Sequence, residues 1–290
     1  MAIPSIAILG GDLRQCYCAE YLLSVGWQVT CFHTPDFPFH GSIRIAGCLP
    51  QALEGTNIIL APTPLSKDNT WLFQADTQKP PCLLASLWDS LLPGQTLAAH
   101  SFGEETRLLL QEKSCRALQL SQAREYAVEN SLLTAEGLLS EVIQKTPFSL
   151  SSAHVLLLGY GCCGSAIGKM LLPICRSITV LEWELGRQAQ AKKDGICPVA
   201  AGSLPNVLPT CSLLINTIPA HVLEPQLMQK LPGSCHIFDI ASAPFGFSKN
   251  ITEKYLMPYF RVPGIPGRFS PATAGQVIGK TIERISDYGL

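Results

Sequence analysis

Short, unbroken apolar runs alternate along the chain with stretches in which apolar residues recur every three or four positions. Continuous runs are typical of strands buried on both faces of a parallel sheet, and the longer spacing is typical of helices packed against it. The chain is therefore expected to be an α/β protein. The expected strands are residues 3–9, 28–32, 57–61, 81–85, 96–101, 116–120, 154–158, 177–182, 213–216 and 236–239. The expected helices are residues 13–25, 104–113, 130–143, 162–172, 185–194 and 273–288.

One apolar run breaks into closely spaced glycines and then resumes at helical spacing. Gly159, Gly161 and Gly164 follow the expected strand 154–158 in the order G-x-G-x-x-G. In this order the first glycine allows a tight turn, the second lets backbone approach a pyrophosphate, and the third lets helix pack on strand. Cys162 and Cys163 would open the helix, whose free N–H groups attract phosphate. We expect these five residues to bind a dinucleotide.

The next expected strand, residues 177–182, ends in an acidic residue eighteen positions after Gly164. A carboxylate about 20 residues beyond the glycines binds a ribose 2′-hydroxyl in such folds and would repel a 2′-phosphate. Glu182 is expected to fill this role, with Glu184 as a second candidate and Trp183 available to cover the adenine. The sequence therefore predicts NAD(H) in preference to NADP(H). A glycine turn without any nucleotide remains the alternative.

Two more strand ends carry polar residues that could line a nicotinamide site. The strand 213–216 ends in Asn216, followed by Thr217, Ile218 and Pro219, and the strand 236–239 ends in Asp239. Ligands bind beyond the carboxyl ends of parallel strands, so we expect these residues to contact the cofactor. A plain turn is the alternative for Asn216 and Pro219.

A second glycine turn, residues 10–15 (GGDLRQ), follows the first expected strand but lacks the third glycine. The chain length of 290 residues suits two domains of about 150 residues each. We therefore expect two Rossmann-like domains with parallel sheets, residues 1–146 for substrate or partner and residues 147–290 for NAD(P). A helix capped by Asn130 and Ser131 would join them, and the C-terminal helix would return toward the first domain.

Charge and cysteine content narrow the choice of ligand and compartment. The 21 basic and 22 acidic residues form no long run of one sign, which gives no footprint for nucleic acid or a membrane surface. The 12 cysteines lack metal-ligand spacing, and the first residues do not resemble a signal peptide, so we expect reduced thiols, no metal and a cytoplasmic location. No apolar stretch reaches the length of a transmembrane helix. A small-molecule ligand is the default, and the oligomeric state, a homo-oligomer included, stays open.

Six separated motifs, in order and covering nearly the whole chain, resemble those of the dipicolinate synthase A subunit family. They are residues 10–15 (GGDLRQ), Asn130-Ser131 with residues 134–137 (TAEG), residues 158–161 (LGYG) with Gly164, residues 215–219 (INTIP), residues 239–242 (DIAS), and residues 263–267 (PGIPG) with residues 271–276 (PATAGQ). The resemblance implies a nicotinamide-dependent oxidoreductase that converts dihydrodipicolinate to dipicolinate. It also implies a flavoprotein-like B subunit of dipicolinate synthase as partner, and the mother-cell cytoplasm of a sporulating bacterium as location. The chain departs from the family at Glu182-Trp183, where the family has a small residue followed by arginine, which suits NADPH.

A dicarboxylate substrate calls for a guanidinium that can bind a carboxylate through two hydrogen bonds. Arg14, in the first glycine turn, is the main candidate, and a pair with Asp12 is its alternative. Arg268 is a weaker candidate. Thr134 and Glu136, near the expected start of the joining helix, are further catalytic candidates, because a helix N-terminus favours a carboxylate. A supporting role in the hinge is the alternative for Glu136.

Two other functions remain open at this stage. The chain could be a non-catalytic subunit that binds the cofactor and docks a catalytic partner. The sequence shows no Ser-His-Asp, Cys-His or two-carboxylate set whose catalytic role is forced. It could also be a hydroxyacid or shikimate-type dehydrogenase, although no Lys/Asp or His/Glu pair occurs at a fixed spacing.

Overall fold

The structure, a computed structural model, describes residues 3–242, 244–247 and 257–287. It divides into two compact units. Unit 1 comprises Met1–Asn130 and Pro266–Leu290, and unit 2 comprises Ser131–Ile265. We describe each unit by itself.

Unit 1 contains a six-stranded sheet whose strands are all parallel, in the order β3-β2-β1-β4-β5-β6. This is the Rossmann order, in which the chain direction across the sheet reverses between the first and fourth strands. Ligands bind at that reversal, beyond the carboxyl ends of β1 and β4. The strands are β1 (Ser5–Leu9), β2 (Gln28–Phe32), β3 (Arg44–Ile45), β4 (Ile58–Leu60), β5 (Thr96–Ala99) and β6 (Arg116–Gln119).

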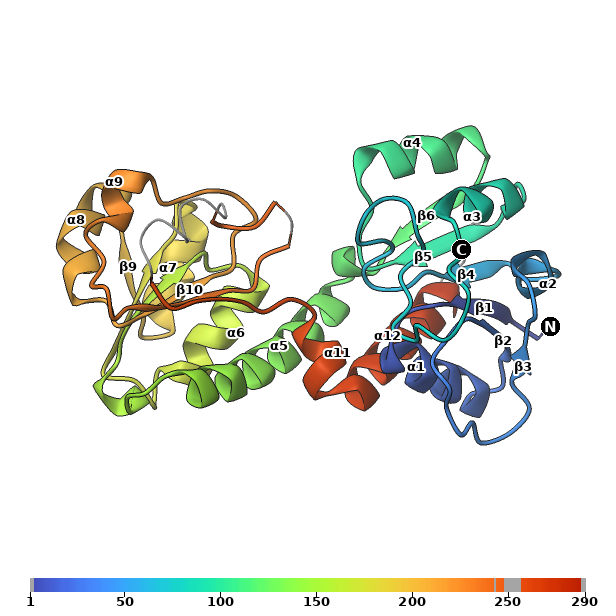
Figure 1. The fold of residues 1–290 in the computed structure, drawn as a ribbon, viewed down its shortest axis with the longest axis horizontal. Helices are drawn as coiled ribbons and strands as arrows, with labels where there is room; N and C mark the ends of the chain where they lie inside the picture. The colour runs from blue at the N-terminus through green and yellow to red at the C-terminus, as the bar shows by residue number, and fades with distance from the viewer. Residues whose placement is uncertain (1–2, 243, 248–256, 288–290) are drawn as a thin grey trace. The chain divides into compact units, whose positions relative to one another are not determined.

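Helices cover both faces of this sheet (Figure 1). They are α1 (Leu13–Ser24), α2 (Leu49–Leu53), α3 (Leu84–Ser90), α4 (Glu104–Glu112), the 3₁₀ helix η1 (Leu120–Gln122) and α12 (Pro271–Asp287). Two further helices cross from one unit's residues to the other's, α5 (Arg124–Lys145) and α11 (Ile265–Phe269).

The C-terminal helix α12 packs against α1 within unit 1, and Figure 1 shows the two helices side by side. Val277, Ile278 and Ile282 of α12 join a buried cluster with Leu22 of α1. Gly279 lies so close to the Tyr21 ring that a Cβ there would come within 2.5 Å of it, which brings the two backbones together. The expected return of the C-terminal helix to the first domain is therefore confirmed.

Unit 2 repeats the same topology with a second six-stranded parallel sheet, in the order β12-β11-β10-β7-β8-β9. Read from β9, this is again the Rossmann order, and its reversal lies between β7 and β10. The strands are β7 (His154–Leu158), β8 (Ser177–Leu181), β9 (Cys197–Val199), β10 (Leu213–Asn216), β11 (His236–Asp239) and β12 (Tyr259–Arg261).

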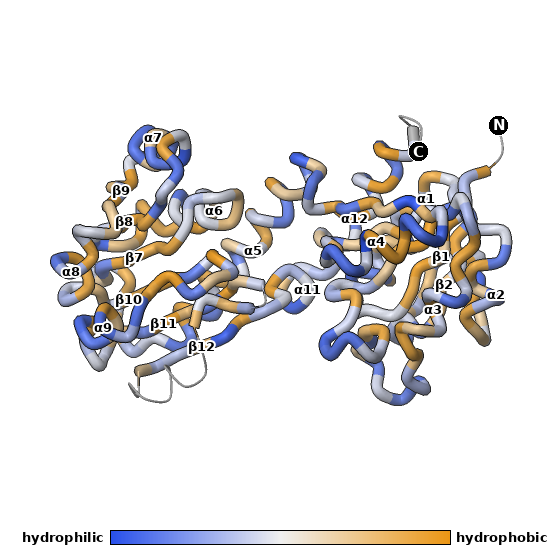
Figure 2. Tube along the Cα trace, turned by 90° about the horizontal axis from the view of Figure 1, so that it is seen from above, coloured by the Kyte–Doolittle hydropathy of each residue, from blue (hydrophilic) through white to orange (hydrophobic). Residues whose placement is uncertain are grey.

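Helices and 3₁₀ turns flank the sheet of unit 2. They are η2 (Leu150–Ser152), α6 (Cys162–Leu171), α7 (Leu185–Lys193), η3 (Ala201–Ser203), α8 (Leu204–Val207), η4 (Leu208–Thr210) and α9 (Pro225–Met228). The central strands are apolar along their length, as Figure 2 shows for β7, β8 and β10. Leu156 and Leu158 of β7, Leu214 of β10 and Ile237 of β11 belong to one buried cluster. The continuous apolar runs of the sequence thus become strands covered on both faces, as expected.

The predicted fold class is confirmed, but two predicted elements are wrong. Residues 81–85 were expected as a strand, whereas α3 starts at Leu84 and buries Leu84 and Leu87, three positions apart. A short apolar run fits a strand or a buried helical turn equally well. The joining helix was expected to start after Asn130-Ser131, whereas α5 starts at Arg124. Both cap candidates therefore lie inside the helix.

The division into compact units places residues 266–290 with unit 1, because α12 packs on α1. The expected boundary between residues 146 and 147 follows directly after the end of α5 and stays a prediction. The expected end of the C-terminal helix at Tyr288 lies outside the described residues.

Candidate functional site

The glycine turn of unit 2 has the geometry of a dinucleotide-binding turn. Gly159 follows β7 with φ of +89°, a conformation that side chains rarely adopt. A Cβ on Gly159 would lie 2.7 Å from Oγ1 of Thr217, and a Cβ on Gly164 would collide with the carbonyl oxygen of Gly159. The first and third glycines are therefore required by close packing of turn, helix and strand.

Gly161 differs from Gly159 and Gly164, because among the described residues, chain neighbours aside, no atom lies within 4 Å of a Cβ built on it. Gly161 is the N-cap of α6 and offers no side-chain cap to the first turn of the helix. The N–H groups of Cys162 and Cys163 in that turn cannot have partners within the helix. The turn thus combines open space with backbone donors at a helix N-terminus, an arrangement that favours a phosphate.

Glu182 lies beside this turn and is 5% exposed. One carboxylate oxygen accepts a 2.8 Å hydrogen bond from the Tyr160 N–H inside the glycine turn. The other accepts from the N–H groups of Trp183 (2.8 Å) and Glu184 (3.0 Å). Glu182 therefore anchors the turn to the end of β8. A carboxylate has about four acceptor positions, so one remains for a ribose hydroxyl.

The surroundings of Glu182 keep it charged and carry a net negative charge. Burial works against the charged form, but the backbone N–H groups of Glu184, Tyr160 and Trp183 outweigh it, with help from Arg187, and lower the pKa of Glu182. Arg187 lies 3.9 Å from Glu182 and 2.7 Å from Glu184. One guanidinium thus faces two carboxylates. Trp183 is 52% exposed and available to stack on a flat group.

Asn216 and Asp239 form a buried network at the ends of β10 and β11, and both are 0% exposed. The Asn216 side-chain amide donates to Asp239 (2.9 Å) and to the Ile218 carbonyl (3.0 Å), and its oxygen accepts from the Ile218 N–H (3.1 Å). Asp239 also accepts from the N–H groups of Ala241 (3.2 Å) and Gly246 (3.0 Å) and from the Tyr259 hydroxyl (3.0 Å). Both side chains are used up in holding the backbone of the two loops.

This network changes the expected roles at the strand ends. Thr217 donates its hydroxyl to the Leu158 carbonyl (2.8 Å), so it ties β10 to β7 beside Gly159. Ile218 is half-buried and Pro219 is exposed. Of the residues predicted here, these two leave side-chain surface accessible, while Asn216 and Asp239 hold the backbone near them. Direct contact of each with a cofactor stays a prediction.

The glycine turn of unit 1 is filled by the chain itself. The Gly11 N–H donates to the Phe73 carbonyl (2.7 Å), and the Ala75 N–H donates to the Gly11 carbonyl (2.8 Å). A Cβ on Gly10 would collide with that same Phe73 oxygen. The segment around Gln74 therefore occupies the place that a pyrophosphate takes in a nucleotide-binding turn. Unit 1 keeps the topology of the nucleotide fold without its open turn.

Arg14 lies at the N-terminus of α1, beyond the carboxyl end of β1. Its Nε and Nη2 donate to the two carboxylate oxygens of Asp12 (2.9 and 2.8 Å), and Nη2 also donates to the Thr63 carbonyl (2.7 Å). Asp12 is the N-cap of α1 and forms a capping box with Gln15. The pair with Asp12, the alternative weighed for Arg14, is thus present in the structure.

One edge of the guanidinium is left over. Arg14 is 5% exposed, and Gly267 lies against it so closely that a Cβ would come within 2.6 Å of Nε. Within the described part of the chain, Nη1 carries no hydrogen bond. A substrate carboxylate could therefore accept a hydrogen bond from Nη1, while Nε and Nη2 of Arg14 form the bidentate pair with Asp12. This role stays a prediction.

Thr134 and Glu136 lie in the middle of α5, because this helix starts ten residues before Thr134. The prediction that a helix N-terminus favours the Glu136 carboxylate is therefore wrong. Thr134 is 7% exposed, whereas Glu136 is exposed. Their catalytic roles remain untested predictions.

The structure also brings forward two residues of unit 1 that the sequence did not single out. His100 directly follows β5, and a ring nitrogen lies 3.1 Å from the Tyr126 hydroxyl. Burial, and secondarily the charge of Arg14, lowers the pKa of His100. Its position immediately after an apolar run was the available signal, because that position lies at the ligand-binding edge of a parallel sheet.

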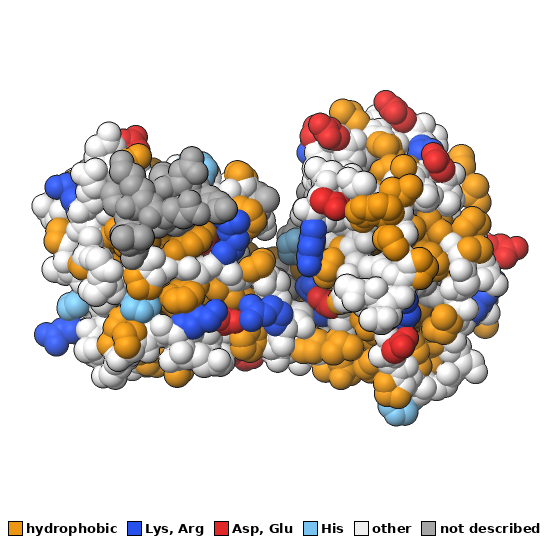
Figure 3. Space-filling model, in the orientation of Figure 1, with side chains coloured by type: hydrophobic (Ala, Val, Ile, Leu, Met, Phe, Trp, Pro, Cys, Tyr) orange, Lys and Arg blue, Asp and Glu red, His pale blue; other side chains and the backbone are white. Residues whose placement is uncertain are grey.

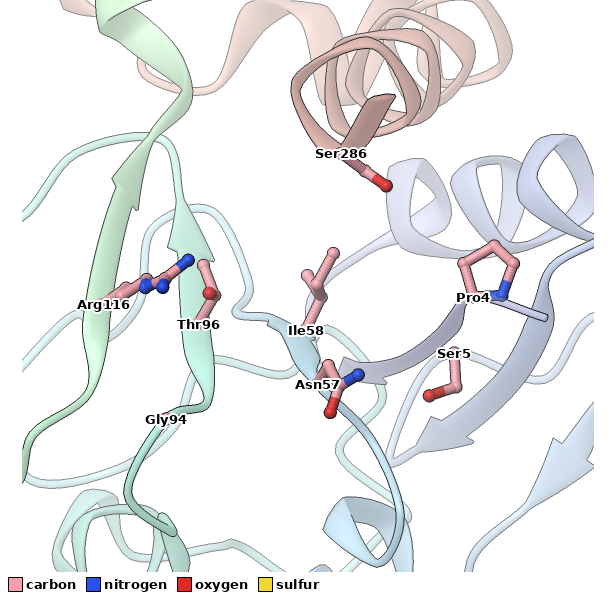
Figure 4. A pocket seen from close by; sticks show the side chains of 8 residues that line it. All are labelled: Pro4, Ser5, Asn57, Ile58, Gly94, Thr96, Arg116 and Ser286. Atoms are coloured by element: carbon pink, nitrogen blue, oxygen red, sulfur yellow. The ribbon is translucent and has the colours of Figure 1, made fainter. Parts of the chain in front are cut away.

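A cavity of about 390 Å³ lies at the opposite, amino edge of the unit 1 sheet (Figure 4). Ser5, Asn57, Thr96 and Arg116 line it from the starts or near the starts of four strands, and the Arg116 side chain extends toward Thr96. The cavity is separate from the carboxyl edge, where Arg14 and His100 lie.

Two features typical of other ligand classes are missing from the described residues. None of their helices is long and apolar enough to cross a membrane. The same residues contain no group of three or more His, Cys, Asp or Glu side chains placed to hold a metal ion. On the face shown in Figure 3, charged side chains of both signs are scattered among apolar and neutral ones.

Comparison with known proteins points to dipicolinate synthase A subunits. Residues 5–121 match the model of the N-terminal domain of the dipicolinate synthase A subunit. The dipicolinate synthase A subunit of Bacillus subtilis (strain 168) is 26% identical over 170 residues, which span 59% of this chain and 57% of that relative. The crystal structure of the dipicolinate synthase A subunit from Bacillus halodurans superposes with a TM-score of 0.86 at 21% identity, covering 97% of both chains. The Bacillus subtilis A chain gives 0.85 at 20% identity, covering 99% of this chain and 97% of that one.

A more distant structure, an L-alanine dehydrogenase, shares the fold with a TM-score of 0.61 at 13% identity, over 98% of this chain and 90% of its own. Two Rossmann-type units, one with a complete glycine turn, define a protein of the dehydrogenase fold. The match of residues 5–121 and the similarity to the Bacillus A subunits confirm the resemblance found in the sequence.

Proposed function

We propose that this chain is an NAD(P)-dependent oxidoreductase that converts dihydrodipicolinate to dipicolinate, together with a flavoprotein-like B subunit, in the cytoplasm of a sporulating mother cell. The observation that carries the proposal is the contrast between the two glycine turns. The turn of unit 2 is open at Gly161, whereas the turn of unit 1 is filled by Phe73. Unit 2 then binds the nucleotide, and unit 1 is left for the substrate.

The residues present fit a dinucleotide in unit 2. The N–H groups that open α6 would hold the pyrophosphate, and Glu182 would accept a ribose hydroxyl while it keeps the glycine turn in place. A nicotinamide cofactor supplies a hydride acceptor. The residues around Ile218 and Pro219 would exclude water from that reaction, because the Asn216–Asp239 network fixes their backbone.

In unit 1, Arg14 would bind one substrate carboxylate through Nη1. Asp12 and the Thr63 carbonyl hold the guanidinium in place, so little side-chain entropy remains to be lost on binding. The hydrogen bond would be assisted by charge on both partners, which makes it one of the stronger kinds.

The decisive experiment measures cofactor reduction with dihydrodipicolinate, with and without the B subunit. Turnover that requires both subunits, with the nicotinamide cofactor bound by this chain, supports the proposal. Turnover by the B subunit in the absence of this chain would favour the non-catalytic cofactor-binding subunit. Turnover of a hydroxyacid but not of dihydrodipicolinate would favour a hydroxyacid or shikimate-type dehydrogenase.

We expect Arg14→Lys to raise the KM for dihydrodipicolinate by about tenfold to a hundredfold. Lysine keeps the positive charge next to Asp12 but cannot reach Asp12 and a carboxylate at once, and a hydrogen bond to a charged group contributes about 1.5–3 kcal/mol. Steady-state kinetics at saturating cofactor measure the change. Arg107→Lys is the control, because Arg107 pairs with Glu104 at the surface of unit 1. An unchanged KM in a folded Arg14→Lys protein would remove Arg14 from the substrate site.

We also expect NAD(H) to bind more tightly than NADP(H), by about fivefold or more. Two carboxylates and one guanidinium lie at the end of β8, which leaves one net negative charge there. Repulsion between two charges about 4 Å apart is on the order of 4 kcal/mol at an effective dielectric constant near 20, and a quarter of that gives about fivefold. Trp183 offers no cation to a 2′-phosphate.

Calorimetric titration with both cofactors tests this preference. The double variant Glu182→Ala, Trp183→Arg should level or reverse it, and Trp183→Arg alone should shift it less, because Glu182 still repels the phosphate. Since Glu182 also holds the Tyr160 N–H, the double variant should bind either cofactor less tightly than Trp183→Arg does. Tighter binding of NADP(H) by the native protein would contradict the prediction and point to Arg187 as the phosphate ligand.

A further inference from the structure

We propose that His100 is the general base that accepts the ring proton when the substrate of unit 1 is oxidised. This inference rests on the proposed function and extends it, because neither the sequence motifs nor the family match assigns a proton acceptor. Three features of unit 1 support it: where the fold places the ring, how the ring is oriented, and which charge lies near it.

The fold brings His100 and Arg14 to the same edge of the sheet. Leu60 of β4 pairs in register with Ala98 of β5, and the Ala61 N–H continues the ladder to the Ala98 carbonyl (2.8 Å). His100 therefore stands next to the residues that follow β4. One of these, Thr63, accepts a hydrogen bond from Arg14. The carboxyl end of β4 thus lies between the imidazole and the guanidinium.

Packing fixes the orientation of the imidazole ring. The His100 Nδ1 lies 3.1 Å from the Tyr126 hydroxyl, and the two ring centroids are 5.7 Å apart. Tyr126 is itself 2% exposed and belongs to the buried cluster under α1 and α12. The backbone is also held, because the Ser121 N–H donates to the His100 carbonyl (3.0 Å). When Nδ1 carries its proton toward Tyr126, Nε2 presents its lone pair.

Nε2 is the atom left for chemistry, since in the described part of the chain no hydrogen bond reaches it. The ring is half-buried, so Nε2 can meet a ligand without being fully solvated. Among the described residues, Tyr126 from α5 contacts a ring nitrogen and Arg14 from α1 acts on the charge of the ring, with Asp12 beyond Arg14. Burial and the Arg14 charge lower the pKa of His100, which keeps the ring neutral and able to accept a proton at neutral pH.

The proposed step balances as follows. One ring hydrogen of the dihydropyridine dicarboxylate leaves with its electron pair as hydride to the nicotinamide, which is the oxidant. A second ring hydrogen leaves as a proton, its bonding electrons enter the ring to complete the aromatic pyridine, and Nε2 forms the new N–H bond. The imidazolium then releases the proton to water. Positioned bases of this kind contribute about a hundredfold to ten-thousandfold to the rate.

We expect His100→Gln to lower kcat by about a hundredfold or more while leaving the KM for the substrate within a fewfold. Glutamine can still hydrogen-bond to Tyr126 but cannot accept a proton at neutral pH. The fall in kcat on the acidic side of the pH profile should disappear in this variant. Tyr126→Phe should lower kcat less and keep that pH dependence, because Tyr126 orients the base without touching the substrate. His40→Gln is the control, since His40 is an exposed histidine of the same unit.

A binding measurement separates failure of this inference from failure of the proposed function. Pyridine-2,6-dicarboxylate is a dianion, so its binding beside Arg14 should raise the pKa of His100 and draw in a proton below neutral pH, where the free imidazole is mostly neutral. Calorimetry in two buffers with different ionisation enthalpies measures that uptake. Uptake by the native protein that is lost in His100→Gln supports the assignment. Equal proton uptake by the native protein and His100→Gln, or an unchanged kcat in His100→Gln, overturns the assignment of His100 and leaves the proposed function standing. Absence of both dipicolinate binding and turnover in the native protein overturns the proposed function as well.

Discussion

Gly161→Val should abolish cofactor binding by this protein without unfolding unit 2. A valine side chain at Gly161 would enter space in which the described residues, chain neighbours aside, place no atom within 4 Å of the Cβ position. The proposed pyrophosphate would meet the N-terminus of α6 at this point. The backbone there has φ −71° and ψ −163°, which valine adopts without strain. We expect affinity for NAD(H) and NADP(H) to fall by at least about a hundredfold, on the order of 3 kcal/mol. Calorimetry and thermal unfolding measure the two properties.

Unit 1 offers a closely matched control for this substitution. Gly103 is the N-cap of α4 with nearly the same backbone conformation, φ −70° and ψ 164°, and open space at its Cβ position. Gly103→Val therefore has the same cost in helix capping but lies in unit 1, outside the glycine turn that is proposed to bind the cofactor. It should change the unfolding midpoint by the same small amount and leave cofactor binding intact. Cofactor binding retained by Gly161→Val would show that the glycines of unit 2 form only a turn.

Gly164→Val should behave in the opposite way. Its Cβ would collide with the Gly159 carbonyl oxygen, so β7 and α6 could no longer approach each other. We expect this variant to lower the stability of unit 2 itself, with cofactor binding lost as a consequence. The two substitutions therefore distinguish Gly161, which leaves space for a ligand, from Gly164, which allows β7 and α6 to pack closely.

Local features of the sequence were enough to predict most of the fold and the glycine turn of unit 2. Residues 154–164 hold strand, turn and helix in one short segment, so their pattern depends little on distant contacts. The start of α5 was missed because it depends on packing. Asn130 and Ser131 are good capping residues, but helix formation continues through them from Arg124, because packing of Tyr126 extends the helix.

The parts of the site that depend on distant segments could not be read from the sequence. The turn at Gly10 and Gly11 is filled by Phe73, about sixty positions away, and no local pattern reports that contact. Arg14 looked available for a carboxylate, but its two-pronged face is used by Asp12. Asp239 stood at a strand end, where ligands bind, yet it faces inward toward four donors. The position of a residue along a strand predicts at which edge of the sheet it lies. The direction in which its side chain points depends on contacts with distant segments and is seen only in the folded structure.

Asp239→Leu should destabilise unit 2 by about 3–5 kcal/mol, the range found when a buried charge network loses one partner. The substitution removes the acceptor of four hydrogen bonds and leaves the N–H groups of Ala241 and Gly246 buried without a partner. A buried donor left unsatisfied costs about 1–3 kcal/mol, so two account for most of the effect. Denaturant unfolding measures the loss in the free energy of unfolding. Hydrogen exchange should show where the structure is weakened, with faster exchange of the backbone N–H groups in the residues that follow β10 and β11.

Tyr259→Phe provides the graded control for this network. It removes one of the four donors and keeps the carboxylate bonded to Asn216, Ala241 and Gly246, so the expected loss is about 1 kcal/mol. If Asp239 instead served mainly to bind the cofactor, Asp239→Leu would weaken cofactor binding while unfolding and exchange stayed close to native. That result would contradict a positioning role. A loss of stability about three to five times that of Tyr259→Phe would show that the carboxylate holds the loop after β11 to the end of β10, from which the loop with Ile218 and Pro219 starts.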